Sequence, residues 1–358
     1  MTGRVLSKSD LVVLGAGVVA VAAAGVLHYS GATAVLAFVV AGVAVALLAS
    51  LVGRSVEQLG DRFGPGATGV LQSALGNLPE LFIGFFALQA GLLAVVQAAI
   101  IGSILSNILL VLGLAFVVGG VKHGTQRFDS DRARTSTVLM VLATAALVMP
   151  SLAQYVHAPA AGHEKALSLV VSVVLLGVFL LSLPSALKRS PVAEPSAPQP
   201  AEHAGPHWPL WLALTMLTGS SVAAALVSDW FVAALEPAIT SLGVSQAFAG
   251  LVIVAIAGNA IENVIGIQLA YRNQADFAMA VIIQSPLQVA LVLAPALVLL
   301  SLFTATTLTL VFAPLLVMAV AVAVLATAFI VFDGESNWLE GATLIALYAI
   351  IATTFWWG

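Results

Sequence analysis

Two glutamates, Glu80 and Glu262, lie within long apolar runs of the sequence. If these runs are membrane helices, each ionised carboxylate costs roughly 2.5 to 3.5 kcal/mol at the helix centre. No Lys or Arg lies within any of the apolar runs, so the compensating charges must be bound protons or bound cations. A pair of carboxylates that can hold either species is chemistry suited to moving cations.

Amide and hydroxyl oxygens accompany both glutamates. Asn77 precedes Glu80, and Asn259 precedes Glu262, by three positions, which puts each amide and carboxylate on one helix face. Calcium accepts about six to eight such oxygen ligands, whereas zinc and copper favour His or Cys, and the chain has no Cys. We therefore predict a calcium site from Glu80, Glu262, Asn77 and Asn259, supported by Gly76, Gly258, Ser103, Asn107, Ser285 and Gln288. For the last four residues, hydrogen bonding between helices is an equal alternative.

Composition identifies the elements that must position these residues. The chain has 358 residues, of which 61% are apolar and 8% are charged, against roughly 25% charged in soluble domains. Its mean hydropathy is +1.11. We predict an all-α polytopic membrane protein, because about 20 apolar residues cross a bilayer as a helix. About eleven spans are expected, at residues 11–28, 31–53, 66–89, 92–119, 136–156, 166–187, 208–228, 244–270, 277–303, 306–330 and 338–356.

The distribution of basic residues predicts the orientation. With a cytoplasmic N-terminus, eleven of the twelve Lys and Arg residues fall on the cytoplasmic side, and Lys165 alone falls on the other. Cytoplasmic loops of membrane proteins are enriched in these residues. The first apolar run follows Arg4 and Lys8 as in a signal peptide, but it is longer than a usual signal core, so we expect a retained helix.

An internal repeat relates the two glutamates. At an offset of 182 residues, Gly76, Asn77 and Glu80 align with Gly258, Asn259 and Glu262, and Ser103 aligns with Ser285. The chain is then an extra N-terminal helix (1–30), a first five-helix repeat (31–187), a Pro-rich cytoplasmic linker (188–207) and a second five-helix repeat (208–358). Because five crossings is an odd number, the second copy enters the bilayer from the opposite side. Such inverted repeats are typical of secondary transporters, whose site lies where the repeats meet.

These two blocks resemble the repeats of the cation/calcium exchanger superfamily, and within it the calcium/proton exchanger (CAX) family. The shared pattern is Gly-Asn-x-x-Glu in both repeats, followed by residues 102–107 (GSILSN) in the first and Ser285-x-x-Gln288 in the second. The resemblance implies that Glu80 and Glu262 bind calcium and protons alternately, with Asn77 and Asn259 as supporting ligands. Three features depart from the CAX pattern: Pro79, Asn263 in place of the usual His, and residues 284–286 (QSP).

The sequence thus predicts a calcium/proton antiporter with no cofactor beyond its transported ions, located in a bacterial inner membrane. Sodium-coupled calcium exchange, sodium or manganese export and a cation channel remain alternatives. Nucleic-acid binding is excluded by a net charge of -4 without a basic patch. An enzyme is not expected, since no nucleotide-binding loop or zinc-protease motif is present.

Overall fold

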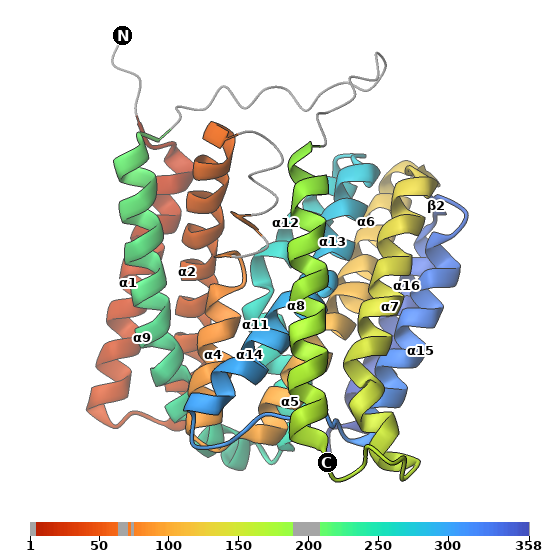
Figure 1. The fold of residues 1–358 in the computed structure, drawn as a ribbon. Coiled ribbons are helices and arrows are strands. Elements are labelled where there is room, and N and C mark those ends of the chain that lie inside the picture. The colour runs from red at the N-terminus through yellow and green to blue at the C-terminus, as the bar shows by residue number, and fades with distance from the viewer. Residues whose placement is uncertain (1–4, 64–70, 73–74, 189–207, 358) are drawn as a thin grey trace. The chain divides into compact units, whose positions relative to one another are not determined.

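The protein is mostly helical in the computed structural model (Figure 1). The structure describes residues 5–63, 71–72, 75–188 and 208–357, and the side chains of residues 61, 63, 131, 132, 182–188, 261 and 262 lie outside the description. The chain separates into two compact units. Unit 1 contains residues 1–83 and 179–235, and unit 2 contains residues 84–178 and 236–358.

Unit 1 is built on three long helices that run side by side, α1 (Lys8–Ser30), α2 (Ala34–Phe63) and most of α9 (Leu210–Leu242) (Figure 1). A capping box between Ser7 and Asp10 begins α1, and Gly31, at φ 68°, ends it. Glycine adopts this left-handed conformation without steric cost, which permits the tight turn into α2. Unit 1 also holds the first turns of α4 (Leu78–Gln89) and the last turns of α8 (Glu164–Lys188).

Unit 2 holds the remaining helices. In chain order they are α5 (Leu93–Leu105), η1 (Ser106–Val111), α6 (Leu112–His123), α7 (Ser130–Tyr155), α10 (Gln246–Phe248), η2 (Ala249–Val254), α11 (Ala255–Gly258), α12 (Ala260–Tyr271), α13 (Ala275–Gln288), η3 (Val289–Leu293), α14 (Ala294–Leu300), η4 (Ser301–Phe303), α15 (Pro314–Val331) and α16 (Trp338–Thr354). Two short strands, β1 (Gln126–Arg127) and β2 (Glu335–Ser336), pair antiparallel with Gln126 opposite Ser336. This pairing joins the α6–α7 loop to the α15–α16 loop.

The described residues include eight helices long and apolar enough to cross a membrane, or nine if the bent pair at 246–258 and 263–271 forms one span. Two shorter apolar helices, Leu78–Gln89 and Trp338–Thr354, accompany them. The polytopic helical class is therefore confirmed. The count of eleven spans and the inverted orientation of the repeats stay predictions.

Three predicted span boundaries are wrong. Helices α2 and α9 continue past residues 53 and 228, to Phe63 and Leu242, because single polar residues such as Arg54 and Asp229 do not end a helix. The third error is at the span predicted for 306–330, which becomes helical only at Pro314.

Residues 304–313 form a non-helical segment within unit 2, although Leu308, Leu310 and Phe312 are buried. Side chains from α5, α7 and α8 satisfy its backbone. Gln97 Nε2 donates to the Thr309 and Val311 carbonyls, at 3.1 and 2.8 Å. Non-helical backbone is tolerated at membrane depth when protein groups satisfy it in this way.

Candidate site around Asn259

Both Gly-Asn pairs identified in the sequence lie at breaks between helices. Gly76 and Asn77 form a turn immediately before α4. Asn259, with φ -90° and ψ 16°, separates α11 from α12, and the helices on either side of this break are inclined by 62°. Discontinuous helices expose backbone groups at their ends and are common in the ion sites of transporters.

In unit 1 the structure describes two of the predicted site residues, Asn77 and Glu80. Asn77 is buried, with 6% of its surface exposed, and its carbonyl accepts the Leu81 N–H at 3.0 Å. Glu80 lies in the first turn of α4, where the positive end of the helix dipole stabilises a carboxylate. Its side chain is partly buried, and Oε2 is shielded from solvent. The sequence thus forms a buried acid at a helix start.

In unit 2 a polar cluster is centred on Asn259, which is fully buried. Its Oδ1 accepts hydrogen bonds from Asn107 Nδ2 and Ser285 Oγ, both at 3.2 Å. Its Nδ2 donates to Ser103 Oγ at 3.0 Å and to the Ala255 carbonyl at 2.9 Å. One amide therefore joins residues from both predicted repeats into a single polar cluster.

Contacts with backbone carbonyls determine which side-chain atom of Asn259 and of Asn107 is the nitrogen and which is the oxygen. The Ala255 carbonyl can only accept, so the Asn259 atom facing it is the amide nitrogen. In the same way Asn107 Nδ2 faces the Ser103 carbonyl at 2.9 Å. Both lone pairs of Asn259 Oδ1 are consequently occupied, whereas Asn107 Oδ1 is buried and has no hydrogen-bond partner among the described side chains. Within this cluster, Asn107 Oδ1 is therefore the amide oxygen that no described group donates to.

A π-helical segment recurs beside these residues at equivalent positions of the two repeats. In the first copy η1 occupies Ser106–Val111, and in the second η3 occupies Val289–Leu293. The 182-residue offset maps 106–111 onto 288–293. π-Helical turns often mark functional sites, since they alter the hydrogen bonding of the surrounding helix.

Two glycines allow the backbones to approach closely at this cluster. A Cβ on Gly102 would collide with the Leu251 carbonyl oxygen, and a Cβ on Gly250 would collide with that of Val95. Helix α5 and segment η2 therefore cross in direct backbone contact. This crossing brings Ser103, the next residue on α5, against the helix pair that carries Asn259.

The predicted supporting residues divide between the two units. Gly76 lies beside Asn77, whereas Gly258, Ser103, Asn107, Ser285 and Gln288 are all buried in unit 2. The backbone of Glu262 lies in α12, and its side chain is outside the described part. Because Glu80 and Glu262 belong to different units, their predicted convergence on one ion stays a prediction.

Two features of the site escaped the sequence analysis. Gly250 lies outside the repeated motifs, and nothing in its local sequence distinguishes it from other glycines in membrane helices. Asn263 was treated only as a departure from a family pattern, yet its Oδ1 is buried and lacks a hydrogen-bond partner among the described side chains. It lies one turn after Asn259, whose carbonyl accepts the Asn263 N–H at 3.1 Å.

Broken apolar helices and a buried cluster of amide and hydroxyl groups define a class, that of polytopic membrane proteins with polar groups in an apolar interior. The model of the family described as "Sodium/calcium exchanger protein" matches residues 33–187 and 212–357. The chain belongs to this family.

Named relatives agree with this assignment. The Ca(2+)/H(+) antiporter of Synechocystis sp. is 35% identical over 92% of this chain and 92% of its own length. The Ca(2+)/H(+) antiporter ChaA of Bacillus subtilis is also 35% identical, over 98% of this chain and 99% of its own. Among solved structures, native YfkE superposes with a TM-score of 0.80 at 32% identity, covering 97% of this chain and 99% of that one. The resemblance to the calcium/proton exchangers is thereby confirmed.

Proposed function

We propose that this protein is a secondary antiporter that exchanges calcium for protons across a membrane. The observation that carries the proposal is the cluster around Asn259, where amide and hydroxyl side chains from both predicted repeats form hydrogen bonds in an apolar interior. The names of relatives that match over nearly their full length support calcium and protons as the exchanged ions. The family consists of transporters, and we propose no enzymatic reaction.

In this proposal Glu80 and Glu262 provide the charge that binds calcium, and Asn77 supports Glu80. Asn107 provides a neutral oxygen directly, because its Oδ1 is the open acceptor of the cluster. Asn259 positions Asn107, Ser103 and Ser285 through three hydrogen bonds, while a fourth, to the Ala255 carbonyl, fixes its own amide. Asn259 Oδ1 would bind the ion itself only after one of the two hydrogen bonds that it accepts is broken.

Exchange follows from competition for the same carboxylates. Two acids that share a dry site repel one another when both are ionised, which raises their affinity for protons. A divalent cation satisfies both charges at once, so calcium and protons exclude each other. If the empty, doubly charged site is too unfavourable to reorient, the carrier moves only when it is loaded, and the two fluxes are coupled.

We further propose that the two five-helix repeats are inverted in the membrane and that the N-terminus is cytoplasmic. The recurrence of a π-helical segment and of a helix break at a Gly-Asn pair supports the repeat. Alternating access would then arise from movement of helices around a fixed ion site. The full-length matches to bacterial relatives favour the bacterial cell (inner) membrane as its location.

Sodium-coupled exchange is the second candidate, favoured by Pro79 beside Glu80 and by the broader family. Calcium flux into proteoliposomes distinguishes the two when an imposed pH gradient is compared with an imposed sodium gradient. A proton antiporter responds to the pH gradient alone and counter-transports protons, whereas a channel carries calcium without proton exchange.

Replacement of either acid tests the assigned residues. We expect Glu80→Gln and Glu262→Gln each to abolish calcium flux while the purified protein remains folded, because one carboxylate cannot balance a divalent ion. Glu335→Gln is the matched control, since Glu335 forms a partly exposed ion pair with Arg127 near β2. Near-normal calcium flux in either site variant would refute the assignment.

A further inference from the structure

Helix α15 contains a single polar residue, Thr327, in a stretch that is otherwise apolar from Pro314 to Val331. Thr327 is fully buried, and its Oγ1 donates to the Ile108 carbonyl in η1 at 3.2 Å. Both residues belong to unit 2. The hydroxyl therefore joins α15 to the π-helical segment that contains Asn107.

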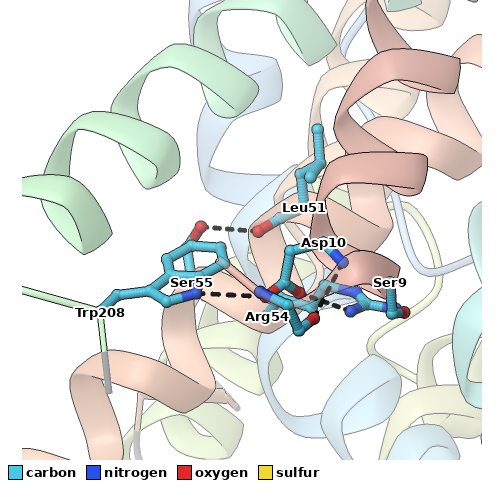
Figure 2. A network of polar contacts seen from close by, with 7 residues as sticks. Ser9, Asp10, Leu51, Arg54, Ser55 and Trp208 are labelled. Carbon is cyan, nitrogen blue, oxygen red and sulfur yellow. Dashed lines mark hydrogen bonds and ion pairs between the residues drawn. The ribbon is translucent and has the colours of Figure 1, made fainter. Parts of the chain in front are cut away.

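This hydrogen bond differs from the one that a hydroxyl in a helix commonly makes, which is to the carbonyl four residues earlier in the same helix. Ser55 of α2 follows the common pattern, since its Oγ donates to the Leu51 carbonyl at 2.7 Å (Figure 2). Thr327 donates instead to a carbonyl of another helical segment. A carbonyl within a regular α-helix already accepts an N–H, so η1 must offer an acceptor that has lost this partner.

The π-helical pairing of η1 frees this acceptor. In an α-helix the Leu112 N–H would donate to the Ile108 carbonyl, four residues earlier. Here the Leu112 N–H donates to the Asn107 and Leu109 carbonyls instead. The Ile108 carbonyl has consequently lost its α-helical donor, and the Thr327 hydroxyl replaces it. Without such a replacement, a buried carbonyl in an apolar interior would be costly.

The second repeat has the same backbone irregularity without the hydroxyl. In η3 the Ala294 N–H donates five residues back and so passes over the Ala290 carbonyl, which the 182-residue offset matches with that of Ile108. Helix α7 packs against η3 as α15 packs against η1, but the residue of α7 that matches Thr327 is Ala145. Because alanine has no hydroxyl, the bond made in η1 has no counterpart at the matching position of η3.

We propose that Thr327 is a positioning residue for the ion site, acting through Asn107. By donating to the Ile108 carbonyl, Thr327 stabilises the π-helical turn in which the Asn107 carbonyl accepts the Leu112 N–H. This pairing fixes the backbone that carries the Asn107 side chain, and with it the Oδ1 atom to which no described group donates. The inference rests on the proposed function, in which that oxygen binds calcium.

Thr327→Val tests this role, because valine keeps the branching of threonine and removes the hydroxyl. We expect the half-saturating calcium concentration for flux in proteoliposomes to rise about fivefold, equivalent to about 1 kcal/mol, with the maximal rate nearly unchanged. Thr327→Ala is expected to show the same rise, whereas Thr327→Ser, which keeps the hydroxyl, is expected to prevent it. Thr144→Val on α7 is the matched control, since the buried Thr144 hydroxyl has no hydrogen-bond partner among the described residues, and calcium affinity is expected to be unchanged.

A double-mutant cycle with Asn107→Ala separates positioning from a general loss of stability. If Thr327 acts through Asn107, Thr327→Val raises the half-saturating calcium concentration by less than about twofold once the Asn107 amide is absent. If removal of the hydroxyl only loosens the packing of α15, the rise is the same in both backgrounds. Thermal unfolding of each purified variant, followed by tryptophan fluorescence, verifies that the variant is folded.

Three results would overturn the inference. They are an unchanged half-saturating calcium concentration in folded Thr327→Val, an equal rise in Thr144→Val, and a rise that persists in full in the Asn107→Ala background. The unaltered protein in the same vesicles is the reference. If it carries no calcium, the proposed function fails and the role of Thr327 fails with it, whereas normal flux in the reference confines any failure to Thr327.

Discussion

Replacing Asn259 with Leu tests whether its amide organises the buried cluster. The change removes four hydrogen bonds and keeps the branching of the side chain. Hydrogen bonds between membrane helices contribute about 0.6 kcal/mol each, and the Ser285 hydroxyl left without its acceptor adds a further desolvation cost of about 1 kcal/mol or more. We therefore expect the free energy of unfolding to fall by about 2 to 4 kcal/mol.

Tryptophan fluorescence of the purified protein in detergent, followed during heating, measures this loss as a lower unfolding midpoint. Calcium flux in proteoliposomes measures the functional effect. We expect the half-saturating calcium concentration to rise at least about tenfold, since Asn107 and Ser103 lose the contact that positions them. A variant with the midpoint and calcium response of the unaltered protein would refute the role of Asn259.

Ser151→Ala provides the control for this experiment. Ser151 is fully buried in unit 2, where its Oγ donates to the Leu310 carbonyl at 3.0 Å and accepts the Phe312 N–H at 2.9 Å. Its loss is expected to lower the unfolding midpoint without changing the half-saturating calcium concentration. An equal loss of calcium affinity in both variants would show that reduced stability alone explains the Asn259 result.

Two further predictions concern packing and surface charge. Gly250→Val is expected to lower the free energy of unfolding by about 1 to 3 kcal/mol, because its Cβ would collide with the Val95 carbonyl. Thermal unfolding measures this loss. Gly177→Val, at a site with open space around the glycine, is expected to leave the unfolding midpoint unchanged. Arg127→Gln breaks the ion pair with Glu335, whose two side chains are 83% and 44% exposed. We therefore expect the free energy of unfolding to change by less than about 0.5 kcal/mol in the same measurement. A larger loss would mean that the pair stabilises the β1–β2 contact more than its exposure suggests.

Hydropathy predicted the membrane class because the apolar runs are long and charges are few. It failed at residues 306–313, where the apolar residues run without a break into the helix that follows although Thr306, Thr307 and Thr309 lie among them. Their backbone is satisfied by side chains distant in the sequence, among them Gln97 on α5 and Ser168 on α8, whose Oγ accepts the Leu310 N–H. Two local signals were nevertheless present: the buried residues Leu308, Leu310 and Phe312 recur at every second position, as in an extended segment, and Pro314 lies in the first turn of the helix that follows.

Repetition was the more informative signal for the site. The shared register identified Asn259, Ser103 and Ser285 before any contact was known, and the structure joins these three with Asn107. The register could not show that Asn259 Oδ1 accepts two hydrogen bonds from neighbouring side chains. Nor could it show that Asn107 Oδ1 accepts none from the described residues. That distinction depends on which carbonyls face the two amides, and hence on the fold.

The two copies preserve backbone irregularities more faithfully than they preserve side chains. Both keep a break at Gly-Asn and a π-helical turn near residue 106 or its counterpart at 288. At the same offset, however, Asn107 corresponds to Val289, and Ser106 corresponds to Gln288. In the second copy the amide side chain is that of Gln288, one position earlier than the counterpart of Asn107. One position corresponds to a rotation of about 100° around a helix, so the two amides lie on different faces. An ion held between such copies meets similar backbone breaks from both, but different amide oxygens, which is how a repeated scaffold can form an asymmetric site.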